Sequence, residues 1–87
     1  MQNYPNPFNS STAIQFKVVK RARIKLEIIN AVGEKVTTLA DNFYNTGIYS
    51  IHWNGEDEND HQVVSGLYFY RLIIGEHVFS RKMLLLR

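Results

Sequence analysis

Apolar and polar side chains alternate with a period of two along much of the chain. The pattern is clearest over residues 14–19, 24–29 and 49–54, where one parity is apolar and the other is mostly polar. Successive side chains of a strand point to opposite faces of a sheet, so this alternation predicts strands with one buried and one solvated face. Val, Ile, Thr, Tyr and Phe, which suit a pleated surface, are frequent in these stretches.

Two later stretches are apolar on both parities. Residues 67–74 are interrupted only by Arg71, and residues 78–86 become apolar toward their end. Such runs are typical of central strands, or of strands that are covered on both faces. A helix over residues 32–42 is the main competing interpretation, but a β-branched run and an early glycine favour a strand there.

Turn-forming residues separate the apolar stretches. Gly75-Glu76 predicts a two-residue hairpin, and the acidic segment 54–61 predicts a longer turn. This spacing, without a helical stripe, predicts an all-β fold, namely an antiparallel immunoglobulin-like β-sandwich of six or seven strands. The expected strands are residues 12–19, 23–30, 34–40, 47–53, 66–74 and 77–86, with a further short strand near 62–64.

The N-terminal residues do not follow this pattern. Residues 1–11 contain both prolines of the chain, and a proline holds the residue before it in an extended conformation. We therefore expect an extended N-terminal segment over residues 1–11, with Phe8 as a plug into the core. A single β-sandwich domain is expected over residues 12–87.

Composition narrows the class of protein. A chain of 87 residues and 10.1 kDa is one small domain, so its apolar residues, 45% of the total, must form a well-filled core. The sequence contains no cysteine, which excludes disulfides, thiolate zinc sites and cysteine nucleophiles. No apolar run reaches the roughly 18 residues that a membrane helix needs, so no membrane span is expected. A net charge of +2 is too small to indicate a nucleic-acid partner.

Several short motifs, spread in order over the whole chain, resemble one known family. They are Asn3–Asn9 with Ser11-Thr12, Val32–Val36, Gly47, Trp53–Asp57, Val64–Leu72 and Arg81–Arg87. Together they resemble the type A C-terminal sorting domain of the type IX secretion system. The fold of that family is similar to the immunoglobulin-like domain of the flagellar hook-capping protein. The differences from the family pattern are chemically mild, such as Arg87 where the family favours lysine.

The resemblance implies a non-catalytic domain that acts as a secretion and sorting signal. Such domains stand at the C-terminus of larger secreted proteins of the Bacteroidetes and related phyla, which cross the inner membrane by an N-terminal signal peptide. The implied partners are the type IX outer-membrane translocon, a sortase-like C-terminal signal peptidase and an upstream cargo domain in the parent chain. The implied location is outside the cell or on the outer-membrane surface, reached through the periplasm.

The end of the chain is the expected recognition element. A terminal segment is accessible to a receptor, and a strand at the edge of a sheet can pair with a strand of a partner. Basic residues in this segment would steer it toward an acidic surface. The expected sorting-signal residues are Arg81, Lys82, Met83, Leu84, Leu85, Leu86 and Arg87. Alternate residues of the same run are expected to pack into the core.

The sequence leaves two other binding sites open. Asp57, Asn59 and Asp60 offer oxygen ligands for calcium, although a solvated turn is favoured because the spacing of a calcium-binding loop is lacking. No other cofactor is expected. Aromatic rings that stack on carbohydrate are the second type of site, although a single tryptophan in such a fold is usually the centre of the core. The candidate stacking residues are Trp53, Tyr68 and Tyr70.

No catalytic residue is predicted, and the function is expected to be non-enzymatic. His52, His61 and His77 lie in separate segments, and the Gly-x-Ser-x-Gly motif of a serine nucleophile is absent. The main alternative is an immunoglobulin-like accessory module of a surface protein or glycoside hydrolase, acting as a spacer or a carbohydrate binder. A flagellar hook-cap type of assembly domain is a third interpretation.

Overall fold

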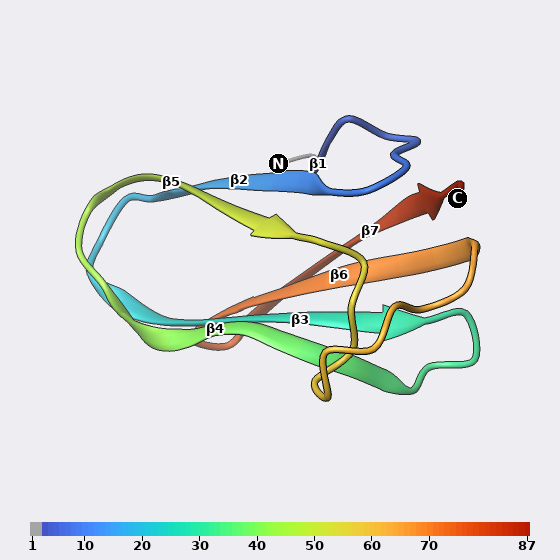
Figure 1. Ribbon diagram of the computed structural model, residues 1–87. Coiled ribbons are helices and arrows are strands. Elements are labelled where there is room, and N and C mark those ends of the chain that lie inside the picture. The colour runs from blue at the N-terminus through green and yellow to red at the C-terminus, as the bar shows by residue number, and fades with distance from the viewer. Residues whose placement is uncertain (1–2) are drawn as a thin grey trace.

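The computed structural model describes residues 3–87, and these residues form strands and no helix (Figure 1). The strands are β1 (Asn3–Tyr4), β2 (Thr12–Val18), β3 (Ala22–Asn30), β4 (Lys35–Tyr44), β5 (Gly47–Trp53), β6 (Gly66–Ile74) and β7 (His77–Leu85). The first two residues of the predicted N-terminal segment lie outside the described residues. The prediction of an all-β chain is confirmed.

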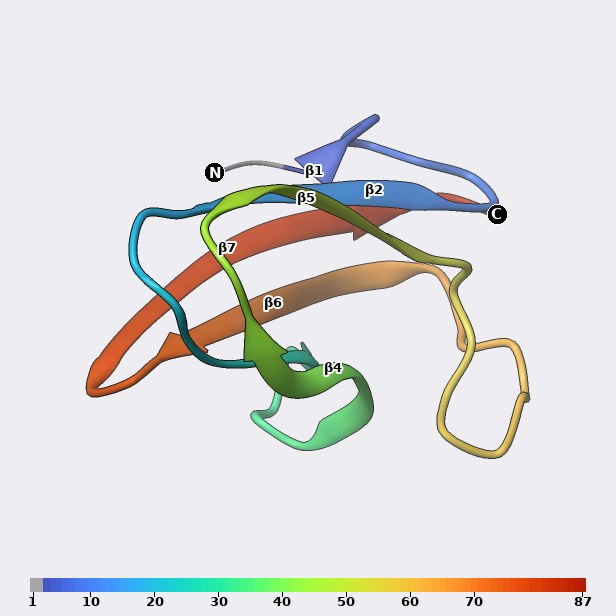
Figure 2. The ribbon, with the colours of Figure 1, turned by 90° about the vertical axis from the view of Figure 1, so that its left-hand side faces the viewer.

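The strands form two sheets that pack face to face. One sheet has the strand order β1-β2-β5, and the other has the order β4-β3-β6-β7. Every pairing between named strands is antiparallel. Figure 2 shows the two layers, with β2 and β5 in the upper layer and β6 and β4 in the lower one. The predicted antiparallel sandwich is therefore confirmed, with seven strands.

The core lies between the sheets and follows the predicted parity. Inward residues of β2, β3, β6 and the C-terminal part of β7 are mostly buried, because each strand turns alternate side chains toward the opposite sheet. Trp53 lies at the end of β5, and its ring packs edge-on against the rings of Phe8 and Tyr68, with centroid distances of 5.6 and 5.3 Å. Phe8 is only 3% exposed, so the predicted plug is confirmed.

Two strands differ from the sequence-based expectation. Asn3 and Tyr4 pair with Ile14 and Ala13, so part of the extended N-terminal segment is a strand of the sandwich. β4 continues to Tyr44 instead of ending at residue 40. Polar residues at 41 and 42 resemble a turn in the sequence, but Asp41 forms an ion pair of 2.8 Å with Arg23 on the neighbouring strand.

The short strand expected near residues 62–64 is not formed. Gln62 makes only an isolated bridge with Glu56. The intervening loop closes on itself instead, because the backbone N–H of Asp57 donates to the carbonyl of His61 and the N–H of Val63 donates to the carbonyl of Gly55. A segment held by such internal bonds has no free row of backbone groups for a sheet.

The outer face of the four-stranded sheet carries one buried carboxylate. Glu27 is 5% exposed, and its carboxylate accepts hydrogen bonds from Arg71 at 3.1 and 3.2 Å. The ammonium of Lys25 lies 3.4 Å from the same carboxylate. Burial raises the pKa of Glu27, but Arg71 and Lys25 outweigh burial, so that the pKa lies below its ordinary value. This cluster therefore stabilises the sheet while Glu27 is ionised.

The hairpin between β6 and β7 has the predicted two-residue loop. Ile74 pairs with His77, so Gly75 and Glu76 are the loop, and Gly75 has a φ of 57°. This positive φ is a conformation that glycine adopts without strain. The hairpin places β7 at the edge of its sheet, where it pairs only with β6 among the named strands. The C-terminal segment is thus an edge strand.

Candidate functional site

The expected sorting-signal residues occupy the second half of β7 and the two residues after it. Met83 and Leu85 are 1% and 0% exposed and pack into the core. Leu84 and Leu86 are 39% and 49% exposed, and Arg81, Lys82 and Arg87 are also exposed. The expectation that alternate residues of this run pack inward is confirmed. Surface residues of the run are therefore available to a partner while the core residues hold the strand in place.

The N-terminal segment covers one edge of this strand. The backbone of Phe8 pairs with β7 in a parallel bridge, because its N–H donates to the carbonyl of Leu84 at 3.0 Å and its carbonyl accepts from the N–H of Leu86 at 2.8 Å. The side chain of Asn6 continues this pairing. Its Nδ2 donates to the carbonyl of Lys82 at 3.2 Å, and its Oδ1 accepts from the N–H of Leu84 at 3.0 Å. We call residues 6–8 the N-terminal clasp.

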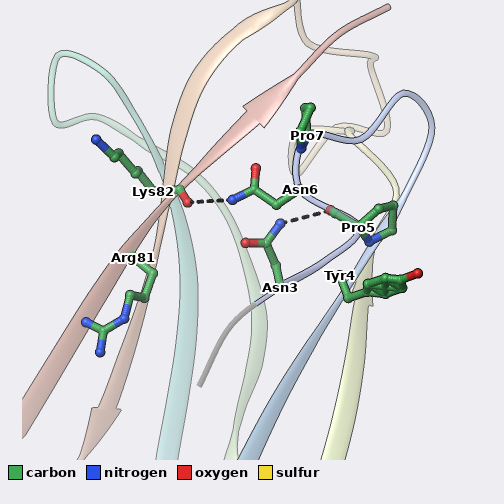
Figure 3. Close-up of a pocket in the computed structure, with 7 residues that line it drawn as sticks. All are labelled: Asn3, Tyr4, Pro5, Asn6, Pro7, Arg81 and Lys82. Carbon is green, nitrogen blue, oxygen red and sulfur yellow. Dashed lines mark hydrogen bonds between the residues drawn. The ribbon is translucent and has the colours of Figure 1, made fainter.

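Figure 3 shows the clasp from the side of the first strand. The amide of Asn6 points at the backbone of β7 next to Lys82, while the side chains of Arg81 and Lys82 extend away from it. An open cavity of about 560 Å³ lies between these two basic residues and residues 3–7. The guanidinium of Arg81 donates only to the neighbouring carbonyl of Ser80, at 3.0 Å. Both basic side chains can therefore reach a bound partner without breaking the fold.

Arg87 ties the end of the chain to the loop between β5 and β6. Its Nη2 donates to the carbonyl of Gly55 at 2.6 Å, and its Nε donates to the carbonyl of Val63 at 2.8 Å. The backbone N–H of Arg87 donates to Oγ of Ser65 at 2.9 Å. A Cβ atom at Gly55 would overlap the guanidinium of Arg87, so a glycine is required at this close approach. Although Arg87 is exposed, its polar atoms are committed to the fold.

The candidate calcium ligands lie in the closed loop between β5 and β6. Oδ1 of Asp57 accepts from the backbone N–H groups of Asn59 and His61 at 2.9 and 3.0 Å. These backbone hydrogen bonds lower the pKa of Asp57. Asp60 has a φ of 62° and its side chain is exposed. The side chain of Asp57 thus stabilises an Asx-type turn. Calcium binding at this loop stays a prediction, which calorimetry at millimolar calcium would test.

The acidic and histidine side chains of residues 3–87 do not gather into a metal cluster. No group of three or more His, Asp or Glu side chains in this part of the chain is arranged to hold a metal ion. His61 lies beside Asp57, with 4.0 Å between Nδ1 of His61 and a carboxylate oxygen of Asp57. That contact joins the exposed His61 to the half-buried Asp57 within the turn.

The three candidate stacking residues are core residues. Trp53, Tyr68 and Tyr70 are 1%, 5% and 0% exposed. The indole N–H of Trp53 donates to the carbonyl of Glu56 at 2.9 Å, and the hydroxyl of Tyr68 donates to the carbonyl of Val64 at 2.7 Å. Burial raises the pKa of both tyrosines. A sugar needs an accessible ring face to stack on, and in this structure these rings do not offer one.

Sequence reasoning missed the contacts that hold the C-terminal strand. Asn6 and Lys82 are 76 positions apart, and Arg87 reaches Gly55 over 32 positions. Hydrophobic periodicity predicts which face of a strand is buried but not which distant segment lies beside it. In the sequence, these contacts are marked only by the motifs that carry the family resemblance, since the clasp lies within Asn3–Asn9 and Gly55 within Trp53–Asp57.

None of the described segments forms a helix long and apolar enough to cross a membrane. Among curated proteins, the sequence finds no match. Similar folds occur in two solved structures from Porphyromonas gingivalis. One is dimeric latent PorU, with 16% identity and a TM-score of 0.77 over 98% of this chain and 9% of that one. The other is PorZ, a surface component of the type IX secretion system, with 18% identity and a TM-score of 0.64 over 99% of this chain and 11% of that one.

These likenesses concern the fold, and the chain spans only about a tenth of either protein. The sequence itself matches the profile of one family. That family is described as "Secretion system C-terminal sorting domain", and the match runs over residues 2–86. It includes both the N-terminal clasp and the exposed residues of β7. The chain belongs to the family of secretion system C-terminal sorting domains.

Proposed function

We propose that this domain is a non-catalytic sorting signal that directs a larger cargo protein through the type IX outer-membrane translocon. The observation that carries the proposal is the family match over residues 2–86. It is supported by the surface of the C-terminal strand, where Arg81, Lys82 and Leu84 are exposed beside the chain end. Basic and apolar side chains on an edge strand form a recognition surface that a receptor can bind without unfolding the domain.

The finer parts of the proposal concern partners and destination. The proposed partners are the translocon itself, a sortase-like C-terminal signal peptidase and the cargo domain that precedes the sandwich in the parent chain. The proposed destination is the medium or the outer-membrane surface. These assignments rest on the family and on the likeness to PorZ, a surface component of the type IX secretion system.

The experiment is an export assay. The domain is fused behind a reporter that carries an N-terminal signal peptide, and the fusion is expressed in a host with a working type IX system. We expect the reporter outside the cell. Deletion of Lys82–Arg87 should leave it in the periplasm, and export of this truncated fusion would contradict the proposal. A host that lacks the translocon provides the background level.

A second variant separates recognition from folding, because the deletion also removes the buried Met83 and Leu85. In the variant Lys82→Glu with Leu84→Ser, the substituted side chains are exposed and the core is kept. The matched control is Lys35→Glu with Val32→Ser, a pair of exposed positions in and beside β4. We expect export to fall for the first pair and to stay unchanged for the second.

The main alternative function is an accessory module that binds carbohydrate or separates domains. The burial of Trp53, Tyr68 and Tyr70 removes the rings on which a carbohydrate site was predicted. A spacer has no reason to depend on Lys82 or Leu84, since neither residue is needed for packing. The export assay with the surface variant therefore also separates a sorting signal from a spacer.

A further inference from the structure

The two halves of β7 differ in how their outer edge is used. In the second half, the clasp binds the carbonyl groups of Lys82 and Leu84 and the N–H groups of Leu84 and Leu86. These are even-numbered residues. In the antiparallel ladder, the backbone N–H and C=O groups of the odd-numbered residues of β7 therefore point toward β6. The same alternation turns the N–H and C=O groups of Val78 and Ser80, and the N–H of Lys82, toward the outer edge.

The first half of that edge is open. In the described part of the chain, no strand pairs with residues 77–81 of β7 on the side opposite to β6. Of these outward groups, the carbonyl of Ser80 accepts from the guanidinium of Arg81. Figure 2 shows β7 running along the side of the sandwich, and Phe8 pairs with its C-terminal end. This row of backbone donors and acceptors can therefore form hydrogen bonds with a further strand.

Among residues 3–87, the opposite sheet is only partly covered on this flank. Within these residues β1 pairs with Ala13 and Ile14 of β2, and the rest of β2 extends beyond that pairing. A groove of about 330 Å³ opens between the two sheets at this place. It is lined by Gln15, Phe16, Lys17, Ile48, Ile74 and Phe79. Phe79 is 37% exposed although it belongs to the inward parity of β7, so the groove offers an apolar site for a side chain of an added strand.

The charge along the open edge is mainly positive, and exposed Glu76 in the hairpin loop is the acidic residue at its start. β2 and β7 contain no acidic residue, whereas Lys17, Arg81 and Lys82 are exposed along them. An added strand with acidic side chains would gain favourable interactions along this edge, and a basic one would be repelled. The clasp shows that β7 accepts pairing on this edge, since Phe8 already pairs there through its backbone.

We infer that residues 78–82 of β7 are a docking edge on which a protein of the export machinery adds an extended segment that contains acidic residues and an apolar anchor. The added strand continues the row of backbone hydrogen bonds that the clasp begins, and its anchor enters the groove beside Phe79. This inference rests on the proposed function, and it places direct contact N-terminal to most of the expected sorting-signal residues. Recognition of this type is β-augmentation, in which backbone bonds give affinity and pockets give specificity.

The test uses the reporter fusion of the whole domain. Ser80→Pro removes the outward N–H of Ser80 and places a ring at the edge, a substitution that edge strands tolerate because that N–H faces solvent. Ser80→Ala is the matched control, since it keeps the N–H. We expect export of the proline variant to fall by about tenfold or more relative to the alanine variant, because a ladder bond is lost and the approach is blocked. Equal export of the two variants would overturn the inference.

A second pair of variants guards against a folding effect of proline. Phe79→Ser removes the apolar wall of the groove, and Phe43→Ser removes an exposed ring from β4, the other edge strand of the same sheet. Only Phe79→Ser should reduce export, while thermal unfolding shows both variants to be folded. If Phe79→Ser is folded and exported normally, the docking edge is wrong. If the unmodified fusion stays in the periplasm, the proposed function fails first.

Discussion

The two ends of the sandwich are built on different principles. The end that holds Trp53 and the chain terminus is closed by side chains that donate to loop carbonyls, as Trp53 does to Glu56 and Arg87 does to Gly55. The end that holds the β6–β7 hairpin relies on strand pairing, and Val19 and Val78 there are 77% and 57% exposed. We call these the closed end and the open end.

The contrast between the two ends explains which parts of the sequence require particular residues. Irregular loops bury carbonyl groups that no sheet satisfies, and an unsatisfied polar group costs free energy, so the closed end needs particular donors at particular positions. Asn3–Asn9, Trp53–Asp57 and Arg81–Arg87, three of the motifs that carry the family resemblance, meet at this end. The open end depends more on strand pairing, although Gly75 is needed in the hairpin and Tyr49 donates to the carbonyl of Asn45 there. The following predictions test that contrast.

The largest expected effect is that of Trp53→Ala at the closed end. It removes a fully buried ring, its edge-on contacts with two aromatic rings and its hydrogen bond to Glu56. We expect the free energy of unfolding to fall by about 3–5 kcal/mol, a large share of the stability of a small domain. Phe79→Ala at the open end should cost about 1 kcal/mol or less. Urea unfolding followed by circular dichroism compares them, and similar losses would refute the contrast.

A smaller effect is expected for Gly55→Ala. The residue has a φ of 75°, which strains an alanine, and the new Cβ would force Arg87 to give up its bond to the carbonyl of Gly55. The expected cost is about 1–3 kcal/mol. In a background of Arg87→Ala the penalty should shrink to the backbone strain alone, because the overlap is gone. A double-mutant cycle measures this coupling, and additive losses would show that Arg87 does not need the glycine.

Asn6→Ala should have a modest effect on stability and a local effect on β7. Two exposed hydrogen bonds to the backbone of β7 are lost, so we expect a cost of about 1 kcal/mol. The amide of Leu84 should exchange its hydrogen faster, since it donates to Asn6. Asn42→Ala is the matched control, because the side chain of Asn42 accepts only from the neighbouring Phe43. Unchanged exchange at Leu84 in Asn6→Ala would mean that the clasp is not formed in solution.

The cluster around Glu27 lies at neither end of the sandwich. It is expected to make the free energy of unfolding depend on pH. The pKa of Glu27 is lower in the folded chain than in the unfolded chain, so the folded state is stabilised while Glu27 is ionised. This contribution is complete above the unfolded pKa, and it is lost as the pH falls through the folded pKa. The stability advantage of the natural chain over Glu27→Gln should therefore be constant from pH 7 to about pH 5 and shrink below that.

Unfolding midpoints measured at a series of pH values test the prediction for Glu27. Glu58→Gln is the control, since Glu58 is exposed in the loop between β5 and β6 and has no arginine partner there. An advantage over Glu27→Gln that grows as the pH is lowered would have the wrong sign. It would show that burial rather than Arg71 determines the protonation of Glu27.

Much of the fold was predictable because local patterns encode it. Alternate residues of the run 83–86 were expected to pack inward, and in the structure Met83 and Leu85 are buried while Leu84 and Leu86 are exposed. The burial of Trp53 was also the favoured interpretation. These features depend on the parity of a strand, which neighbouring residues determine.

The rest depends on contacts between distant segments. Asp41 looks like a turn residue in the sequence, and the continuation of β4 makes sense only once Arg23 of the neighbouring strand forms its ion pair with Asp41. In the same way, nothing local to Asn6 reveals that its amide imitates a strand by pairing with the backbone of β7. The positions of the expected recognition residues were therefore predictable, but the half of β7 that stays open was not.

The clasp also has a mechanical consequence. Phe8 and β7 run parallel, so the direction in which the chain enters the domain and the direction in which it leaves are aligned side by side. A pull on the chain before Asn6, with the C-terminal end held fixed, loads the bonds of Phe8 and Asn6 together in shear instead of opening them one after another. A tether built in this way resists force better than one that unzips.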